Sequence, residues 1–91
     1  MSISSHVFTI INDKGLHARA SARFVEVVEK FESEATVEKD GLESSGSSIM
    51  GLLMLAASKG TMIKVTSNGK DSEEMISALH NLIKSKFGED N

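Results

Sequence analysis

The chain has 91 residues, of which 40% are hydrophobic and 25% are charged, and its formal net charge at pH 7 is −3. This length fits one domain over residues 1–91 with one modest core, and the balance of apolar and charged residues excludes a chain that is disordered throughout. The acidic net charge, together with only four aromatic residues, all of them Phe, argues against a nucleic-acid-binding protein.

The first part of the chain predicts a strand and then a helix. Residues 6–11 are rich in β-branched and aromatic side chains and predict a strand that ends at a turn over residues 12–15. Apolar residues then recur at helical spacing over residues 18–31, while charged residues occupy the other face. The apolar positions of this helix are Ala18, Ala22, Phe24, Val25, Val28 and Phe31.

A hairpin and a short helix are expected next. Residues 34–39 alternate apolar and polar side chains, and Asp40 followed by Gly41 favours a tight turn into an antiparallel strand over residues 42–45. A short apolar helix is predicted over residues 49–57. Either of the two preceding serines, Ser47 and Ser48, suits its N-cap position, where the hydroxyl accepts a hydrogen bond from a free backbone N–H group.

The last third of the chain predicts a strand and a final helix. Residues 62–67 alternate as a strand, and residues 68–69 have the composition of a turn. A helix over residues 72–87 follows, with Asp71 and Glu74 at the spacing of a capping box. Its apolar face consists of Met75, Ile76, Leu79, Leu82 and Ile83.

The element order is therefore β-α-β-β-α-β-α. In so short a chain this order predicts an α+β fold, a two-layer open-faced sandwich in which helices pack on one face of an antiparallel sheet. Several unrelated functions use this layout, so the fold alone does not decide the function.

The composition and the chain's first residues bear on its environment. There is no cysteine, which excludes disulfide bonds, cysteine zinc ligands and thiol chemistry. Residues 1–6 lack the basic and apolar regions of a signal peptide. The longest apolar run, residues 49–57, is far shorter than the ~20 residues of a membrane helix. We therefore expect a cytoplasmic protein with neither a membrane nor a nucleic acid as partner.

His17 and Arg19 stand at the start of the helix predicted from residue 18. The first N–H groups of a helix lack intrahelical partners and carry the positive end of its dipole, so they can bind phosphate. An imidazole there can act as a nucleophile near neutral pH, and a guanidinium matches phosphate oxygens. One interpretation of the pattern is a transient phosphate carrier that uses His17, Arg19 and the backbone N–H groups of Ala18 and Arg19. The alternative is an ordinary surface histidine.

Metal chemistry is a weaker interpretation of His17. A metal site needs several ligands, and the other two histidines, His6 and His80, lie far away in the sequence on other elements. We expect neither a metal site nor a cofactor.

The short helix is apolar on all sides, which is the second unusual feature. Leu52 and Leu55 are spaced to face the sheet, so its other apolar side chains point elsewhere. Such a helix is either buried all round or presents a docking surface. Methionine adapts to several partners and so favours docking. The candidate docking residues are Ile49, Met50, Leu53 and Met54.

Two motifs in register, GLHARASARF at residues 15–24 and SSIMGLLMLAASKG at residues 47–60, carry a resemblance to a known family. They resemble the HPr phosphocarriers of the bacterial phosphotransferase system and their nitrogen-branch relatives, called NPr. The resemblance covers nearly the whole chain and implies a four-stranded antiparallel sheet under three helices. It implies a carrier that is a substrate of enzyme I, not an enzyme with its own turnover.

The resemblance also assigns roles to residues. Enzyme I, phosphorylated by phosphoenolpyruvate, would pass the phosphoryl group to Nδ1 of His17, with Arg19 assisting, and His17 would pass it to an EIIA-type acceptor. Ser48 matches the regulatory serine of many members, the substrate of an HPr kinase/phosphorylase. The protein is expected to be a monomer. Ala20 stands where the family usually has proline, and since alanine is a good helix former, the helix start should survive.

Two alternatives remain open from the sequence. One is an NPr-type regulatory relay in place of sugar transport. The other is an α+β protein-binding module that is not phosphorylated, in which the short helix is an ordinary partner surface.

Overall fold

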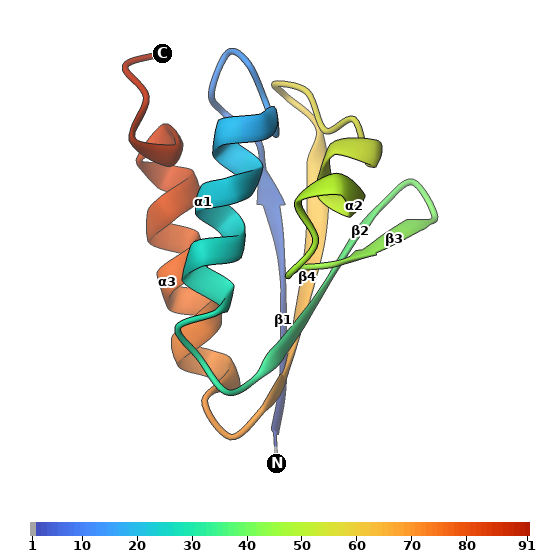
Figure 1. Cartoon of the computed structure of the whole chain (residues 1–91), viewed down its shortest axis with the longest axis vertical. Helices are drawn as coiled ribbons and strands as arrows, with labels where there is room; N and C mark the ends of the chain where they lie inside the picture. The colour runs from blue at the N-terminus through green and yellow to red at the C-terminus, as the bar shows by residue number, and fades with distance from the viewer. Residues whose placement is uncertain (1) are drawn as a thin grey trace.

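The structure is a computed structural model and describes residues 2–91. Its helices and strands follow the predicted order β-α-β-β-α-β-α, with a short 3₁₀ helix after the last α-helix (Figure 1). They are β1 (Ser2–Thr9), α1 (Ala18–Val28), β2 (Glu34–Lys39), β3 (Leu42–Ser45), α2 (Ile49–Met54), β4 (Met62–Gly69), α3 (Ser72–Lys84) and η1 (Lys86–Gly88).

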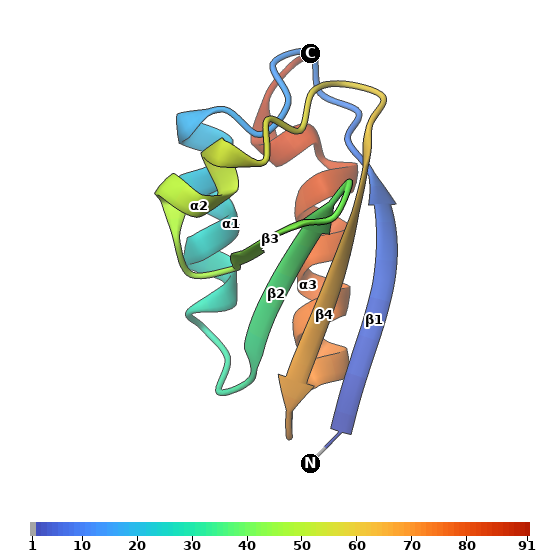
Figure 2. The ribbon, with the colours of Figure 1, turned by 90° about the vertical axis from the view of Figure 1, so that its right-hand side faces the viewer.

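The strands form one four-stranded antiparallel sheet in the order β1-β4-β2-β3. The three α-helices lie on one side of this sheet (Figure 2). Val7 and Met62, which point to the other side, are exposed. The two-layer open-faced α+β sandwich predicted from the element order is thus confirmed.

The core lies between the two layers. On β4, Ile63 and Val65 are fully buried, while their neighbours Met62 and Lys64 are exposed. This is the alternation expected along a half-buried strand. The helices contribute Phe24, Leu52, Leu79 and other apolar side chains. Complete burial of a side chain of this size contributes about 1.5–3 kcal/mol.

One local prediction is confirmed in detail, and one open alternative is decided. Asp40 and Gly41 both have positive φ, 51° and 84°, as the tight turn between β2 and β3 requires. Ser48, and not Ser47, caps α2: the Gly51 N–H group donates to Ser48 Oγ at 2.9 Å.

Helices α1 and α2 are both shorter than predicted. Helix α1 ends at Val28 because the next residues tighten into i→i−3 bonds, from Lys30 N–H to Val27 O and from Phe31 N–H to Val28 O. Helix α2 ends at Met54, since Ala56 adopts φ 53°. The expected apolar face of α1 was also wrong at its start, because Ala18 is exposed and Ala20 and Ser21 are buried instead.

The predicted bounds of the two long strands were wrong as well. Strand β1 begins at Ser2 and pairs along its length with β4, so residues 68–69 continue the strand and do not form the predicted turn. Gly69 is required there by close approach. A Cβ atom at this position would lie 2.4 Å from Ser33 Oγ and 2.6 Å from Ser33 Cα.

The predicted capping box at Asp71 does not form. Asp71 is the N-cap residue of α3, but in the described chain its side chain makes no capping bond to that helix. Its carboxylate instead accepts hydrogen bonds from the N–H groups of Glu32 and Ser33, both at 2.9 Å, and from the Ser33 hydroxyl. Asp71 therefore ties the start of α3 to the loop after α1.

No helix within residues 2–91 is both long and apolar enough to cross a membrane.

Candidate functional site

The site is built around the N-terminus of α1. His17 is the N-cap residue, with an extended backbone (φ −76°, ψ −177°), and within residues 2–91 its imidazole makes no capping bond. The first intrahelical bond runs from Ser21 N–H to His17 O at 2.8 Å. The N–H groups of Ala18, Arg19 and Ala20 therefore precede the hydrogen-bond ladder and point out of the helix end.

The turn before His17 packs against the segment that follows α2. Leu16 is buried, and its N–H group donates to Ala57 O at 2.9 Å. Gly15 has φ +64°, and a Cβ atom there would lie 2.4 Å from Ala57 O, so only glycine fits this position. These contacts place His17 beside the segment that follows α2.

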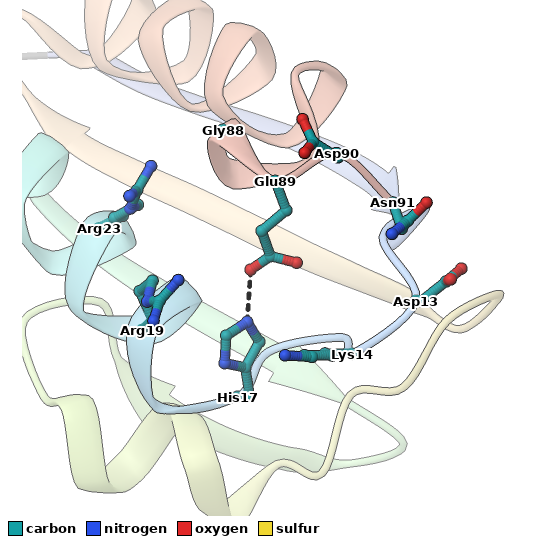
Figure 3. A pocket seen from close by; sticks show the side chains of 9 residues that line it. All are labelled: Asp13, Lys14, His17, Arg19, Arg23, Gly88, Glu89, Asp90 and Asn91. Carbon is teal, nitrogen blue, oxygen red and sulfur yellow. Dashed lines mark hydrogen bonds and ion pairs between the residues drawn. The ribbon is translucent and has the colours of Figure 1, made fainter.

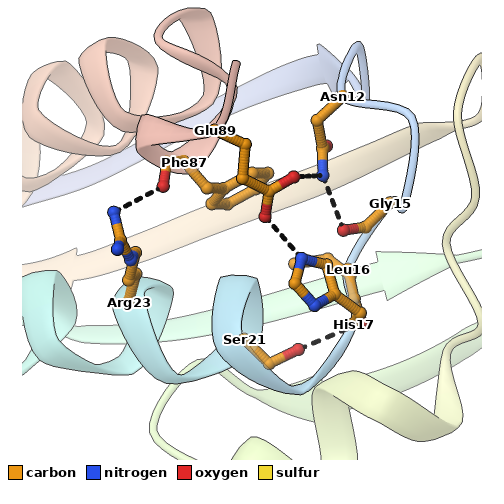
Figure 4. A network of polar contacts seen from close by, with 8 residues as sticks. All are labelled: Asn12, Gly15, Leu16, His17, Ser21, Arg23, Phe87 and Glu89. Atoms are coloured by element: carbon orange, nitrogen blue, oxygen red, sulfur yellow. Dashed lines mark hydrogen bonds and ion pairs between the residues drawn. The ribbon is translucent and has the colours of Figure 1, made fainter. Parts of the chain in front are cut away.

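Glu89, which the sequence did not indicate, contacts the His17 ring. One carboxylate oxygen, Oε2, is hydrogen-bonded to His17 Nε2, and the other, Oε1, accepts from Asn12 Nδ2 at 3.0 Å (Figure 4). The same Asn12 nitrogen donates to Gly15 O at 2.9 Å. The carboxylate is therefore held at both oxygens, between the ring and the turn that precedes it.

The chain reaches this place by a sharp reversal after α3. Lys86 and Phe87 adopt positive φ (58° and 57°), so the predicted helix over residues 72–87 ends early, at Lys84. Phe87 is fully buried, and its carbonyl accepts from Arg23 Nη1 at 2.7 Å. The C-terminal segment thus lies beside the loop that carries His17, as both ribbon views show (Figures 1 and 2).

His17 opens into a pocket of about 360 Å³ (Figure 3). Arg19, the second residue indicated by the sequence, lines the same pocket. Three cationic side chains, Lys14, Arg19 and Arg23, lie on its α1 side and loop side, opposite the C-terminal segment. The lining residues are Asp13, Lys14, His17, Arg19, Arg23, Gly88, Glu89, Asp90 and Asn91.

The charge on Glu89 reflects two opposed effects. Burial raises the pKa of its carboxyl group, whereas hydrogen bonds from His17 and Asn12 and electrostatic attraction to the neighbouring basic side chains, Lys14 among them, lower it. The lowering effects prevail, so the pKa of Glu89 lies below its ordinary value and the group is a carboxylate at neutral pH.

The apolar residues of α2 divide as expected. Leu52 and Leu55 are buried, at 0% and 3% exposure, while Met50 and Met54 are 69% and 74% exposed. Ile49 is also exposed and Leu53 is half-buried. We call Ile49, Met50, Leu53 and Met54 the α2 patch. A hollow of about 230 Å³ is lined by Lys14, Leu16 and His17 and by residues 56–58, which follow α2.

The other two histidines are not part of this site. His6 on β1 and His80 on α3 lie together, with ring centroids 6.2 Å apart, and both pack near Phe8. Ala20 stands where the family usually has proline. It is fully buried in the first turn of α1, and this turn forms without a proline.

Comparison with known proteins decides the family. Residues 4–85 match the family model described as the PTS HPr component phosphorylation site. The chain belongs to the HPr family. It is therefore similar to phosphocarriers of the phosphotransferase system across nearly its whole length, and the resemblance inferred from the two motifs is confirmed.

Individual HPr relatives agree with this. The phosphocarrier protein HPr of Neisseria meningitidis serogroup A is 50% identical over 80 residues, covering 88% of this chain and 90% of that protein. A crystal structure of HPr from Thermoanaerobacter tengcongensis superposes with a TM-score of 0.92 at 44% identity, covering 97% of this chain and 99% of that one. A phosphocarrier protein NPr, from Shewanella violacea, is 35% identical and covers 89% of each chain.

Proposed function

We propose that the protein carries a phosphoryl group on His17 from enzyme I to an EIIA-type acceptor of the phosphotransferase system. It acts as a cytoplasmic monomer, with residues 1–91 as one domain, and is a substrate of enzyme I, not a catalyst with its own turnover. The observation that carries the proposal is the His17 ring, which stands at the open N-terminus of α1 in a pocket it shares with Arg19.

The nucleophile is Nδ1, because Nε2 is engaged by Glu89. In the transfer, the P–N bond of the donor phosphohistidine breaks, its electron pair stays on the donor nitrogen, and the Nδ1 lone pair forms the new P–N bond. The N–H groups of Ala18 and Arg19 and the Arg19 guanidinium stabilise the phosphate oxygens. They must hold the group without trapping it, because it leaves again to the acceptor.

The α2 patch is the docking surface for both partners. It consists of three exposed apolar side chains and the half-buried Leu53, and the residues that follow α2, 56–58, line a hollow together with His17. An apolar surface next to the reactive ring would exclude water around the transfer, and its methionines would adapt to two different partner proteins.

Ser48 is a regulatory site, the substrate of an HPr kinase/phosphorylase. Its hydroxyl caps α2, directly before Ile49 and Met50 of the α2 patch. A phosphate adds about −1.5 to −2 charge at neutral pH. The helix N-terminus would tolerate this charge, but it would have to lose water when a partner covers the patch, so docking would weaken.

The test is incubation with enzyme I and labelled phosphoenolpyruvate. We expect acid-labile label on the protein, its complete loss in His17→Ala, and unchanged labelling in His80→Ala, which is a matched control on α3. Labelling of the His17→Ala protein would overturn the proposal. No labelling of any variant would favour the alternative of an unphosphorylated binding module.

A regulatory NPr-type role is the second candidate, supported by the 35% identity to the NPr of Shewanella violacea. It shares the chemistry at His17 and differs in the acceptor. Transfer from the labelled protein to a sugar-branch EIIA and to a nitrogen-branch EIIA, measured side by side, separates the two roles.

A further inference from the structure

We propose that Glu89, held by Asn12, is a positioning residue for His17: its carboxylate accepts the Nε2–H proton and so leaves the lone pair on Nδ1. This inference rests on the proposed function, and it names two residues that decide which ring nitrogen can accept the phosphoryl group.

The Glu89 carboxylate is hydrogen-bonded at both of its oxygens. The Glu89 side chain is only 16% exposed, and each of its two oxygens has a fixed partner, His17 on one side and Asn12 on the other. A carboxylate bound at both oxygens cannot rotate away from the ring without breaking a second hydrogen bond. The ring is accordingly held at one orientation (Figure 4).

Asn12 holds the Glu89 carboxylate although one of its own polar atoms stays unpaired. It is fully buried, and its one amide nitrogen bridges Gly15 O and Glu89 Oε1. Its amide oxygen, Oδ1, has no hydrogen-bond partner within residues 2–91. A buried polar atom without a partner is destabilising. The fold therefore retains an imperfectly satisfied side chain at the position that joins the turn before His17 to the carboxylate.

The chemistry of the ring explains what the carboxylate does. A neutral imidazole has one N–H and one lone pair, and a hydrogen bond at one nitrogen decides which it is. An acceptor at Nε2 selects the tautomer with Nε2–H and a nucleophilic Nδ1. When Nδ1 takes the phosphoryl group, positive charge develops on the ring while the Nε2 proton stays in place. Glu89 stabilises that charge, and when the P–N bond breaks again the electron pair returns to Nδ1.

The surrounding charges allow Glu89 to remain ionised in this role. From the loop before α1 it faces Lys14 and Asp13, from α1 it faces Arg19 and Arg23, and on its own segment it adjoins Asp90. The three cationic side chains outnumber the two other side-chain carboxylates in the lining of the pocket. The pKa of Glu89 lies below its ordinary value despite its burial.

The decisive experiment compares Glu89→Gln with a matched control, Asp90→Asn. Both remove one carboxylate from the lining of the same pocket, but Asp90 is exposed and Glu89 contacts the ring. We expect ¹⁵N NMR of His17 to show mainly the Nε2–H tautomer in the unchanged protein and in Asp90→Asn, and a mixture in Glu89→Gln. The rate of phosphoryl acceptance from enzyme I should fall about 10-fold or more in Glu89→Gln alone, the size of the loss when the hydrogen-bond partner of a metal-binding histidine is removed.

Asn12→Ser tests the second residue. It removes the bridging amide. We therefore expect a mixture of tautomers and slower phosphoryl acceptance again, with both effects smaller than in Glu89→Gln. An unchanged tautomer in Asn12→Ser would remove Asn12 from the assignment, and an unchanged tautomer and rate in Glu89→Gln would overturn it entirely. The NMR measurement needs no enzyme I, so a protein that accepts no phosphoryl group would contradict the proposed function while the positioning role is still measured.

Discussion

His17 is one of three histidines, and its surroundings separate it from the other two. His6 and His80 pack against each other and against Phe8, an arrangement of rings that contributes to packing. His17 instead has a carboxylate at one nitrogen and lies at a helix N-terminus. Its neighbour Arg19 is exposed, so its side chain matters little for folding and its effect should fall on transfer.

Replacing Arg19 by Lys should slow phosphoryl transfer without abolishing it. Lysine keeps the positive charge but loses the planar pair of donors that matches two phosphate oxygens. Arg19→Ala should be slower still, with a melting temperature close to that of the unchanged protein. Rapid-quench transfer rates with both partners, together with thermal denaturation, check this. Transfer rates unaffected by Arg19→Ala would exclude Arg19 from the site.

At the scale of elements, α2 has a buried face and an exposed face. Leu52 and Leu55 are buried against the rest of the fold, whereas Met50 and Met54 extend from it. So short a helix, six residues long, has little stability of its own and depends on its buried face and its Ser48 cap. Changes on the two faces should therefore have separable effects.

Met50→Glu and Leu52→Ala form a matched pair on this helix. Met50→Glu should weaken binding to enzyme I, because a charge enters an apolar contact, and should leave the melting temperature nearly unchanged. Leu52→Ala should lower the free energy of unfolding by about 2–5 kcal/mol, because it leaves a cavity in the core. Denaturant unfolding and titration calorimetry measure both quantities. An unfolded Met50→Glu protein would mean that α2 is buried all round.

The loop after α1 and the start of α3 depend on one carboxylate, Asp71. The Ser33 hydroxyl and the backbone N–H groups of Glu32 and Ser33 lower the pKa of Asp71 below its ordinary value of 3.8. A carboxyl group with a lowered pKa in the folded state stabilises the protein above pH 3.8, and this contribution is lost as the pH falls through the lowered value.

Asp71→Asn should therefore lower the melting temperature at pH 7 and bring the variant closer to the unchanged protein in strongly acidic solution. Melting curves recorded from pH 7 to below pH 3 would show the difference narrowing on the acid side. A difference that is constant with pH would assign the effect of Asp71→Asn to packing alone.

At the scale of the whole molecule, the residues proposed for transfer, docking and regulation lie at the N-terminus of α1 and on α2, two helices that contact each other. His17 lines a hollow with residues 56–58, which follow α2, and Ser48 caps the N-terminus of that helix. A partner that covers the α2 patch while its histidine approaches His17 would therefore also meet Ser48. We therefore expect a charge at Ser48 to influence transfer without touching the His17 ring.

Ser48→Asp should slow phosphoryl acceptance from enzyme I while leaving the melting temperature the same or slightly higher. Aspartate retains an N-cap oxygen and adds a negative charge that the helix N-terminus favours, but the charge opposes docking at Ile49 and Met50. Ser47→Asp is the control, because Ser47 is exposed and does not provide the cap. Normal transfer by the Ser48→Asp protein would leave Ser48 as a helix cap without a regulatory role.

The sequence by itself determined the features that depend on neighbours in the chain. The bounds of β2 and β3 follow from alternation and from the turn at Asp40 and Gly41, and the start of α1 places His17 and Arg19 at a helix N-terminus. These features arise within a few residues, where backbone preference and hydrophobic spacing act directly.

Only the tertiary structure decided the features that join distant segments. Glu89 contacts His17 across 72 positions, and Asp71 leaves its predicted cap to bind Ser33 across 38. An acidic residue near the end of a chain resembles any solvated charge until the fold brings a partner to it. Close approach likewise selects glycine at position 69, where the backbone meets Ser33. Such contacts depend on how helices and strands pack against each other, and the local pattern of residues does not predict that packing.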